Sequence, residues 1–413
     1  MQPLPGFRDF LPADCAARNY IFARWREMAR RYGFVEWDGP VLELTELYKK
    51  KSGPEIADQL FNFTDKGERE VSLRPELTPT LARVVAAHDR EFKKPLKWFS
   101  IGQFFRYEKQ QRGRLREHFQ LNCDIIGEAG LAADVELVAL AIDLLRGFGF
   151  AEKDFVVRIS DRAFWTDFLR RSDVPEAQWQ GVLQAIDKSE REPREKTAEK
   201  LGKLADPVLQ ILKEGGASEK LEQLVAGLRA RGLADFVEVD VRIVRGLAYY
   251  TGIVFEVFDR AGKLRAIAGG GRYDNLIGQL SDGAVSLPAL GFAMGDVVLG
   301  ELIREHGDAR EKMESAARGE QKIDVYVVIA KEERRADALA QVQALREQGF
   351  RVDYPLTPAK VGKQFQKAEQ LVARAAILFG DEWTQVSVKN LATGEQQLMA
   401  KDDLSSRLES ILQ

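Results

Sequence analysis

Charged and polar side chains concentrate in the stretch "FFRYEKQQRGRLREHFQLNCDII", residues 104–126. Two alternating apolar and polar segments flank a cation-rich centre, a pattern typical of a β-hairpin. Alternate residues of a strand share a face. One face therefore carries mainly polar side chains: Phe104, Arg106 and Glu108 on the first strand and His118, Gln120, Asn122 and Asp124 on the second. The other positions of the second strand are apolar and fit a core: Phe119, Leu121, Cys123 and Ile125.

This polar face favours a ligand site. Buried polar groups need hydrogen-bond partners, and several that converge without a ligand would be costly. A solvated outer face stays open as an alternative. The cations at the tip have an alternative role too, because charged residues keep the edge of a sheet in solution.

A second group of residues suited to anion chemistry lies in "VRGLAYYTGIVFE", residues 244–256. Arg245 precedes the pair Tyr249 and Tyr250 at the start of a predicted strand. An arginine held beside aromatic rings can bind a phosphate or carboxylate through two hydrogen bonds. The alternative is a structural ion pair with Glu256 or Asp240.

Two further stretches complete the candidate site. In "SLRPELTPTLAR", residues 72–83, Glu76 and Thr78 stand where a strand gives way to a helix, although Thr78 could simply cap that helix. In "AGGGRYDNLI", residues 268–277, three glycines suit a strand that a ligand approaches closely, or else a bulge or tight bend. Neither a Walker-type phosphate loop nor a strand–GxGxxG–helix unit is present.

The overall composition narrows the class of protein. The chain has 413 residues, 45% hydrophobic and 30% charged, with a net charge of −3, so nucleic acid would bind through local patches rather than a global basic field. Two cysteines, Cys15 and Cys123, and three histidines argue against a disulfide framework and against a metal site built from protein Cys and His. The start "MQPLPGFRDFLPAD" lacks a signal pattern and no apolar run approaches about 18 residues. We therefore expect a cytoplasmic protein without membrane partners.

The elements that would position these residues fall into two bodies. Residues 1–320 are expected to form an α+β core of mostly antiparallel strands, with a hairpin over 56–74, helices after Glu76 and over 131–145, and a helical insertion at about 165–233. The charged run "KSEREPREKTAEKLGK" in that insertion indicates a solvated helix face more than an RNA contact. A polar linker over 302–322 would lead to an α/β domain over 322–413.

The order and spacing of these stretches resemble the histidyl-tRNA synthetase family of class II aminoacyl-tRNA synthetases over nearly the whole chain. "GFRDFLP" and "GPVLE", with Pro40, look like the family's opening and its dimer-forming motif 1. "LRPELT" is similar to LRPEGT, and "FRYEKQQRGRLREHFQ" looks like motif 2. "RGLAYYTG" and "AGGGRYD" resemble the two histidyl signatures, and the last stretch, ending in "GDEWTQVSVKNLATGEQ", resembles the anticodon-binding domain.

The resemblance implies a role for each matching position. Arg106 would hold the α-phosphate of ATP, Glu108 the adenine side, and Arg245 the charge that develops at the α-phosphate. His118 stands where the family has an aromatic residue stacked on adenine, which an imidazole can also do. Arg114 would contact ATP and Gln111 the tRNA acceptor end. The implied histidine pocket is Glu76, Thr78, Gln120, Asp124, Tyr249, Tyr250 and Tyr273, with Glu76 on the α-amino group and Asp124 on the imidazole.

Several positions depart from the family pattern. Val298 stands where motif 3 usually has an arginine that packs on ATP, so a substitute cation such as Arg112 or Arg114 is expected if activity is retained. Ala248 replaces an aspartate, and Asp124 replaces a longer glutamate. Leu77 replaces a glycine, and Lys109–Gln110 replace Arg-Pro.

The resemblance implies a histidine–tRNA ligase, in which ATP, L-histidine and tRNA(His) give histidyl-tRNA, AMP and diphosphate through histidyl-adenylate. Adenylate formation needs an aligned carboxylate and phosphate and neutralised charge, which two arginines and Mg²⁺ on the outgoing diphosphate can supply. ATP and Mg²⁺, a homodimer and tRNA(His) are the implied cofactors and partners. The alternative is a non-charging, histidine-binding paralogue, such as a regulatory subunit of ATP phosphoribosyltransferase or a sensor of histidine or uncharged tRNA. That regulatory subunit typically lacks the C-terminal domain and both arginines.

Overall fold

The structure is a computed structural model that describes residues 2–50, 59–107, 113–245 and 249–412. The chain forms two compact units, the first made of Met1–Asp9 and Arg18–Met313 and the second of Phe10–Ala17 and Glu314–Gln413. Helix α1 (Pro12–Arg31) contributes residues to both units.

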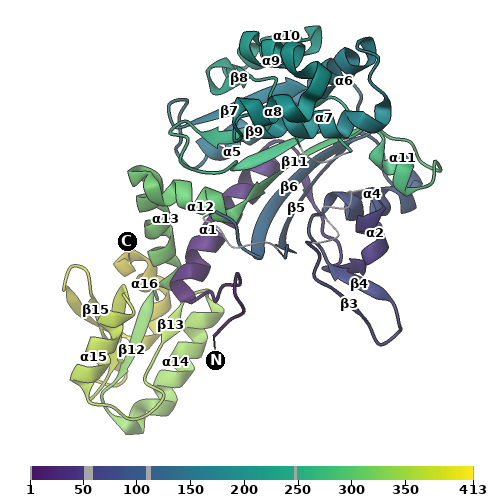
Figure 1. Ribbon diagram of the computed structural model, residues 1–413. Coiled ribbons are helices and arrows are strands. Elements are labelled where there is room, and N and C mark those ends of the chain that lie inside the picture. Colours follow the sequence, from purple (N-terminus) through teal and green to yellow (C-terminus); the bar gives the residue numbers. More distant parts are fainter. Residues whose placement is uncertain (1, 51–58, 108–112, 246–248, 413) are drawn as a thin grey trace. The chain divides into compact units, whose positions relative to one another are not determined.

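The first unit is built around an eight-stranded sheet (Figure 1). Its order is β1 (Val35–Glu36), β5 (Leu96–Phe105), β6 (Glu117–Ile126), β11 (Ala289–Gly295), β10 (Ala268–Arg272), β9 (Ile253–Asp259), β7 (Phe155–Asp161) and β8 (Val237–Val239). The six central strands pair antiparallel, and the short strands β1 and β8 add a parallel pair at each edge. This confirms the predicted α+β class with an antiparallel core sheet.

The hairpin of β5 and β6 has the predicted alternation. Leu121, Cys123 and Ile125 are buried, and Phe119 contacts Phe22 of α1 with ring centroids 5.2 Å apart. Helix α5 (Leu131–Arg146) packs on β6, β10 and β11. The apolar positions of β6 thus belong to the core under the helices, which leaves the polar positions for the opposite face of the sheet.

A smaller antiparallel sheet lies beside the large one, in the order β2 (Leu42–Leu44), β4 (Glu70–Leu73) and β3 (Asn62–Thr64). The pairing of β3 with β4 confirms the predicted hairpin over the described part of 56–74. Helices α2 (Thr45–Lys49) and α4 (Thr78–Ala87) flank this sheet. The predicted helix after Glu76 is therefore present and begins at Thr78.

The insertion is helical, as predicted, and has its own core around Trp165. Its helices are α6 (Arg162–Arg171), α7 (Glu176–Lys188), α8 (Arg194–Leu201), α9 (Ala205–Glu214) and α10 (Glu219–Ala230). The stretch 302–322, interpreted as a polar linker, is also largely helical. It holds the end of α12 (Asp296–Glu305) and all of α13 (Gly307–Gln321), whose Ala309 and Met313 are buried. Two apolar side chains a turn apart suffice to seat a helix that is otherwise charged.

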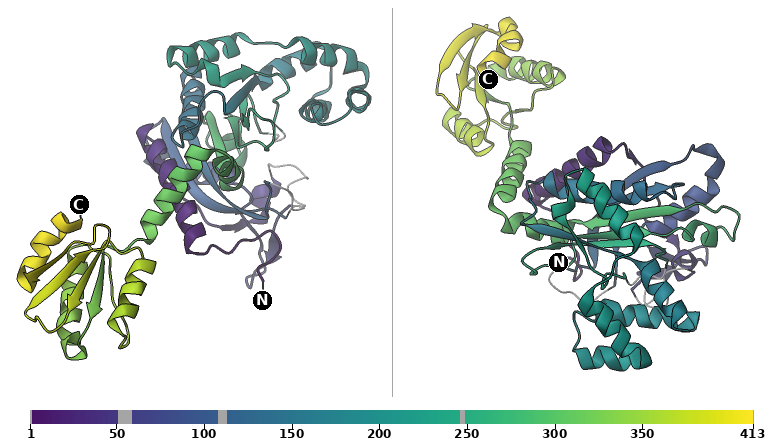
Figure 2. Two further views of the ribbon diagram at one scale, coloured as in Figure 1. Left: turned by 90° about the vertical axis from the view of Figure 1, so that its left-hand side faces the viewer. Right: turned by 90° about the horizontal axis from the view of Figure 1, so that it is seen from above.

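The second unit has a mixed sheet in the order β13 (Val352–Asp353), β12 (Val325–Ile329), β14 (Ala375–Phe379), β15 (Gln385–Asn390) and β16 (Gln396–Ala400). Helices α14 (Arg335–Glu347) and α16 (Leu404–Leu412) pack on one face and α15 (Val361–Gln370) on the other, as Figure 2 shows. The predicted α/β pattern is confirmed, whereas β16 and α16 were not predicted. Short 3₁₀ turns complete both units: Asp89–Glu91, Gly202–Leu204, Ala234–Phe236, Glu332–Arg334 and Lys401–Asp403.

Candidate functional site

The polar face of the large sheet forms the floor of a cavity of about 770 Å³. The register places Asp124 of β6 between Trp98 of β5 and Gly291 of β11. It likewise places Ala293 of β11 between Asn122 and Gly269. The lining includes all the described residues that the sequence assigned to the site: Glu76, Thr78, Arg106, Arg114, His118, Gln120, Asp124, Arg245, Tyr249, Tyr250 and Tyr273. The alternative of a solvated outer face is therefore wrong for this hairpin.

Glycine residues at the centre of the cavity floor leave space for neighbouring side chains. A Cβ on Gly269 would lie 2.5 Å from Nη1 of Arg245, and a Cβ on Gly291 would overlap the carboxylate of Asp124. Strand β10 pairs without interruption with both β9 and β11, so the alternative of a bulge at 269–271 is wrong. The missing side chains instead leave room for the arginine and the carboxylate of the pocket.

Two tyrosine–carboxylate pairs stand in the pocket. The hydroxyl of Tyr249 donates to Oε2 of Glu76 over 2.9 Å, and that of Tyr273 donates to Oδ1 of Asp124 over 2.6 Å. Burial raises the pKa of the Asp124 carboxyl to about 7 despite the hydrogen bond from Tyr273. The rings of Tyr249 and Tyr250 lie 5.1 Å apart between centroids. These pairs orient two carboxylates that line the cavity and can accept N–H groups of a ligand.

Three side chains form a hydrogen-bonded row along β6. Nε2 of His118 lies 3.2 Å from Oε1 of Gln120, and Nε2 of Gln120 donates to Oδ1 of Asn122 over 2.8 Å. Burial and the nearby charge of Arg106 lower the pKa of His118 to about 4, so its imidazole is neutral at pH 7. The buried Nδ2 of Asn122 has no hydrogen-bond partner among the described residues. This donor is a polar group that a ligand would satisfy.

Arg245 is held by a carboxylate and a ring. Its Nη1 donates to Oε1 of Glu256, and its Cζ lies 5.8 Å from the ring centroid of Tyr250. Burial alone would lower its pKa, but Tyr250 and Glu256 together raise it. The ion pair with Glu256, one of the two alternatives, is thus present, whereas Asp240 pairs with Arg242 and Arg158. Arg245 nevertheless lines the cavity. Its backbone has a φ of +57°. Its buried Nε has no hydrogen-bond partner among the described residues.

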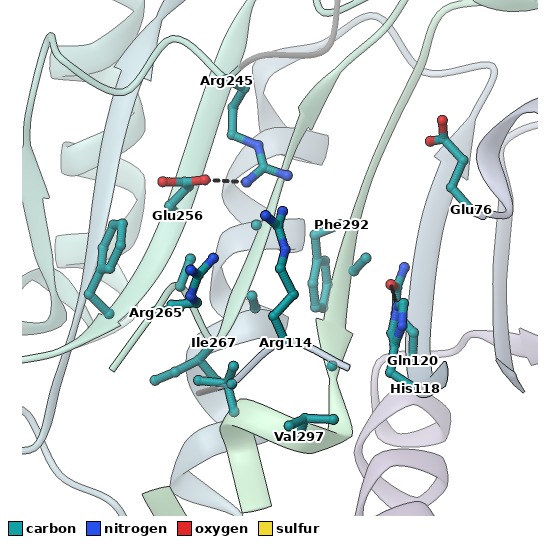
Figure 3. Close-up of a pocket in the computed structure, with 18 of the residues that line it drawn as sticks. Glu76, Arg114, His118, Gln120, Arg245, Glu256, Arg265, Ile267, Phe292 and Val297 are labelled. Carbon is teal, nitrogen blue, oxygen red and sulfur yellow. Dashed lines mark hydrogen bonds and ion pairs between the residues drawn. The ribbon is translucent and has the colours of Figure 1, made fainter. Parts of the chain in front are cut away.

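The remaining predicted residues reach the cavity from the hairpin, in the case of Arg106 and Arg114, and from α4, in the case of Thr78. Nε of Arg106 donates to the carbonyl of Pro75 over 3.0 Å, which ties the base of the hairpin to the segment of Glu76. Arg114 extends across the cavity towards Arg245 (Figure 3). Thr78 is the first residue of α4 and Leu77 occupies the cap position without a side-chain cap, so the interpretation of Thr78 as the cap is wrong. Glu108, Gln111, Arg112 and Ala248 lie outside the described residues.

The structure adds lining residues that the sequence did not indicate. Arg158 comes from β7, whereas Glu190 and Arg191 lie in the segment that follows α7. Arg158 and Glu190 form an ion pair with an N–O distance of 3.0 Å. Asp259 is the last residue of β9, and Arg265 lies in the connection of β9 to β10. For Arg265, the one available signal in the sequence is the cationic character of "DRAGKLRA", which stands just before the glycine stretch. Val298, expected at an arginine position, lines the cavity and is 7% exposed.

A partly buried network of ion pairs links the hairpin to α12. Arg8 donates through Nη2 to Glu117 over 3.0 Å and through Nη1 to Asp296 over 2.9 Å. The other oxygen of Asp296 accepts the backbone N–H of Phe119 over 2.8 Å. Burial raises the pKa of Asp296 although Arg8 opposes this. The N-terminal "GFRDFLP" stretch therefore supports the strand that carries the polar row.

The parts of the chain that the structure describes contain neither a recognisable metal site nor a helix suited to a membrane. They hold no group of three or more His, Cys, Asp or Glu side chains that could bind a metal ion. In those same ranges no helix has both the length and the apolar character required to cross a membrane.

Comparisons with known proteins agree with this geometry. Residues 6–296 match the family model described as histidyl-tRNA synthetase, and residues 324–411 match that of an anticodon binding domain. The chain is 47% identical to a histidine–tRNA ligase of Opitutus terrae, over 92% of this chain and 91% of that protein. It is 39% identical to a chloroplastic/mitochondrial histidine–tRNA ligase of Arabidopsis thaliana, over 98% of this chain and 86% of that protein. The fold is similar to that of apo histidyl-tRNA synthetase of S. aureus, with a TM-score of 0.73, 25% identity and complete coverage of both chains.

Proposed function

This chain belongs to the histidyl-tRNA synthetase family, and we propose that it works as a class II histidine–tRNA ligase on ATP, L-histidine and tRNA(His). The alternative of a non-charging regulatory paralogue is disfavoured by the close relationship to proteins named histidine–tRNA ligase. The single observation that carries the residue roles is the convergence of two tyrosine-paired carboxylates with Arg106, Arg114 and Arg245 around one cavity.

Histidine is proposed to bind between the two carboxylates. Glu76 would accept its α-ammonium group, with Thr78 and Tyr249 beside it. Asp124, oriented by Tyr273, would accept an imidazole N–H, with Gln120, Tyr250 and the free donor of Asn122 nearby. A pocket with such polar groups rejects side chains that leave them unpaired.

ATP is proposed to lie on the arginine side of the cavity. A carboxylate oxygen of histidine attacks the α-phosphorus, a new P–O bond forms, and the bond to the β-phosphate oxygen breaks with departure of diphosphate. Arg106 and Arg245 stabilise the charge on the α-phosphate, and no protein nucleophile is needed. His118 would stack on adenine as a neutral ring. Glu108, on the adenine side, and Gln111, at the tRNA acceptor end, keep the roles that the resemblance implies.

In the second step a ribose hydroxyl at the tRNA 3′ end attacks the carbonyl carbon of the adenylate, and AMP leaves. The second unit, which matches the anticodon binding domain, would bind the other end of the tRNA. Among the described residues no group of three or more His, Cys, Asp or Glu side chains could hold a metal ion, so these residues do not fit a metal held by the protein itself. Mg²⁺ would be carried by the phosphates of ATP.

We further propose a homodimer that acts in the cytoplasm. Strands β1 and β2 of the motif 1 region expose apolar side chains, among them Val35, which is 64% exposed, and Leu44, which is 51% exposed. Exposed aliphatic residues on these strands favour coverage by a second copy. Sedimentation or light scattering would measure the mass in solution, and a monomer at micromolar concentration would contradict the dimer.

The decisive experiment is histidine-dependent exchange of diphosphate into ATP by the purified protein, with the other nineteen amino acids as controls. Exchange with histidine alone, followed by charging of tRNA(His), is the expected result. Histidine binding without exchange would instead identify a sensor or regulatory paralogue.

A further inference from the structure

The turn between β9 and β10, residues 260–267, is held by a buried carboxylate. Oδ2 of Asp259 accepts the backbone N–H of Lys263 over 2.9 Å, and Oδ1 accepts that of Leu264 over 2.9 Å. Asp259 is 5% exposed, and the N–H of Ile267 donates to the carbonyl of Val257 over 2.8 Å at the far end of the turn. The backbone on both sides of position 265 is therefore fixed.

Arg265 projects from this fixed turn into the cavity, near Arg114 (Figure 3). Its aliphatic part lies close to Gly113, in the turn that precedes β6. A Cβ placed on Gly113 would lie 3.6 Å from Cδ of Arg265 and 3.4 Å from Cγ2 of Val298. The two side chains thus lie beside the same short segment of backbone, one ending in a guanidinium and the other in methyl groups.

Charge in this part of the cavity suits an anion. The carboxylate of Glu256 binds Arg245, and both oxygens of Asp259 accept backbone N–H groups. Arg114 and Arg265 bring positive charge to the same region, whereas Val298 of α12 brings none. A guanidinium on a rigid turn loses little freedom on binding and can donate two hydrogen bonds to a phosphate.

We propose that Arg265 binds the phosphate end of ATP and supplies there the positive charge that position 298 does not. This inference rests on the proposed function, because it assigns a further nucleotide contact to the same cavity. Arg265 is a binding residue, and Asp259 acts as a positioning residue that orients the turn.

The test compares Arg265→Ala with Lys263→Ala, a control that removes an exposed cation from the same turn outside the cavity lining. Calorimetry would measure the affinity of each variant for ATP, AMP and histidine. Loss of a charge-assisted pair weakens ATP binding roughly 10- to 100-fold in Arg265→Ala. AMP and histidine binding should change less than about twofold, and Lys263→Ala should resemble the unsubstituted protein.

Other outcomes would overturn the proposal: unchanged ATP binding, or equal losses for ATP and AMP. A defect seen only in tRNA charging, with normal diphosphate exchange, would assign Arg265 to tRNA and also overturn it. Absence of exchange by the unsubstituted protein would refute the proposed ligase, while the ATP and AMP affinities would still test Arg265. Failure of the unsubstituted protein to bind ATP would overturn both.

Discussion

The guanidinium of Arg245 lies directly against the backbone of Gly269. A Cβ at position 269 would stand 2.5 Å from Nη1, 2.8 Å from Cζ and 3.2 Å from Nη2 of the arginine. Only glycine allows this approach, so the glycine stretch of β10 and the arginine before the tyrosine pair form one functional unit. Neither stretch reveals this partnership when it is considered alone.

Gly269→Ala should therefore displace Arg245 while the sheet stays intact. We expect a loss of diphosphate exchange approaching that of Arg245→Ala, because the added methyl group occupies the space of the guanidinium. Gly181→Ala is the matched control, since a Cβ there meets no atom within 4 Å. Near-normal exchange by folded Gly269→Ala would contradict the proposed coupling.

Arg245→Ala should reduce adenylate formation by roughly 10²-fold or more, the scale for losing a preorganised group that stabilises developing charge. Single-turnover formation of histidyl-adenylate would measure this, with Arg242→Ala as a control, because Arg242 binds Asp240 and does not line the cavity. If Arg245→Ala turned over at a rate close to that of the unsubstituted protein, Arg245 would have no role in the mechanism.

Asp124→Ala should weaken histidine binding far more than ATP binding, since the proposed imidazole acceptor is lost. The pKa of about 7 adds a pH dependence, because only the ionised carboxylate accepts two N–H groups. Below pH 7 histidine affinity should fall more steeply in the unsubstituted protein than in Asp124→Asn, in which position 124 does not titrate. Calorimetry across pH 5.5–8.5 would test this, and equal losses for histidine and ATP would argue against the role.

The same carboxyl should affect stability without ligand. The pKa of Asp124 in the folded protein, about 7, lies above the ordinary value of 3.8. Between pH 3.8 and pH 7 the folded state therefore binds a proton at Asp124 that the unfolded state has already lost. Stability from this group is thus highest at low pH and is lost as the pH rises through about 7. Asp124→Asn should raise the melting temperature by a few degrees at pH 8 and by less at pH 5, as calorimetric scans at the two pH values would measure. A melting temperature lowered at pH 8 would contradict this.

Arg8→Ala should destabilise the first unit by about 3–5 kcal/mol, because it leaves the buried carboxylates of Glu117 and Asp296 without their cation. Arg18→Ala offers a comparison, since that arginine lies over aromatic rings instead. Urea unfolding would give both values, and a smaller loss for Arg8 than for Arg18 would show that the network contributes little.

The sequence anticipated most of the elements that carry the site. Period-two alternation in residues 117–126 separated the polar row from the core, since that pattern depends only on neighbours along one strand. It did not anticipate that residues 307–321 form a helix, because two buried apolar side chains among many charges give a weak periodic signal. Strand β16 and helix α16 were missed for a similar reason: each is short, and β16 is mostly exposed.

The sequence by itself determined which residue types the site contains: the polar row of β6, the carboxylates Glu76 and Asp124, the tyrosines and the arginines. Only the tertiary structure decided their partners. Glu76 meets Tyr249 across 173 positions and Asp124 meets Tyr273 across 149. These pairs, and the position of both Arg265 and Val298 beside Gly113, depend on how β9, β10 and β11 assemble beside β6. The spacing of residues along one strand does not indicate which distant strands become its neighbours, because the packing of the whole sheet determines the pairing.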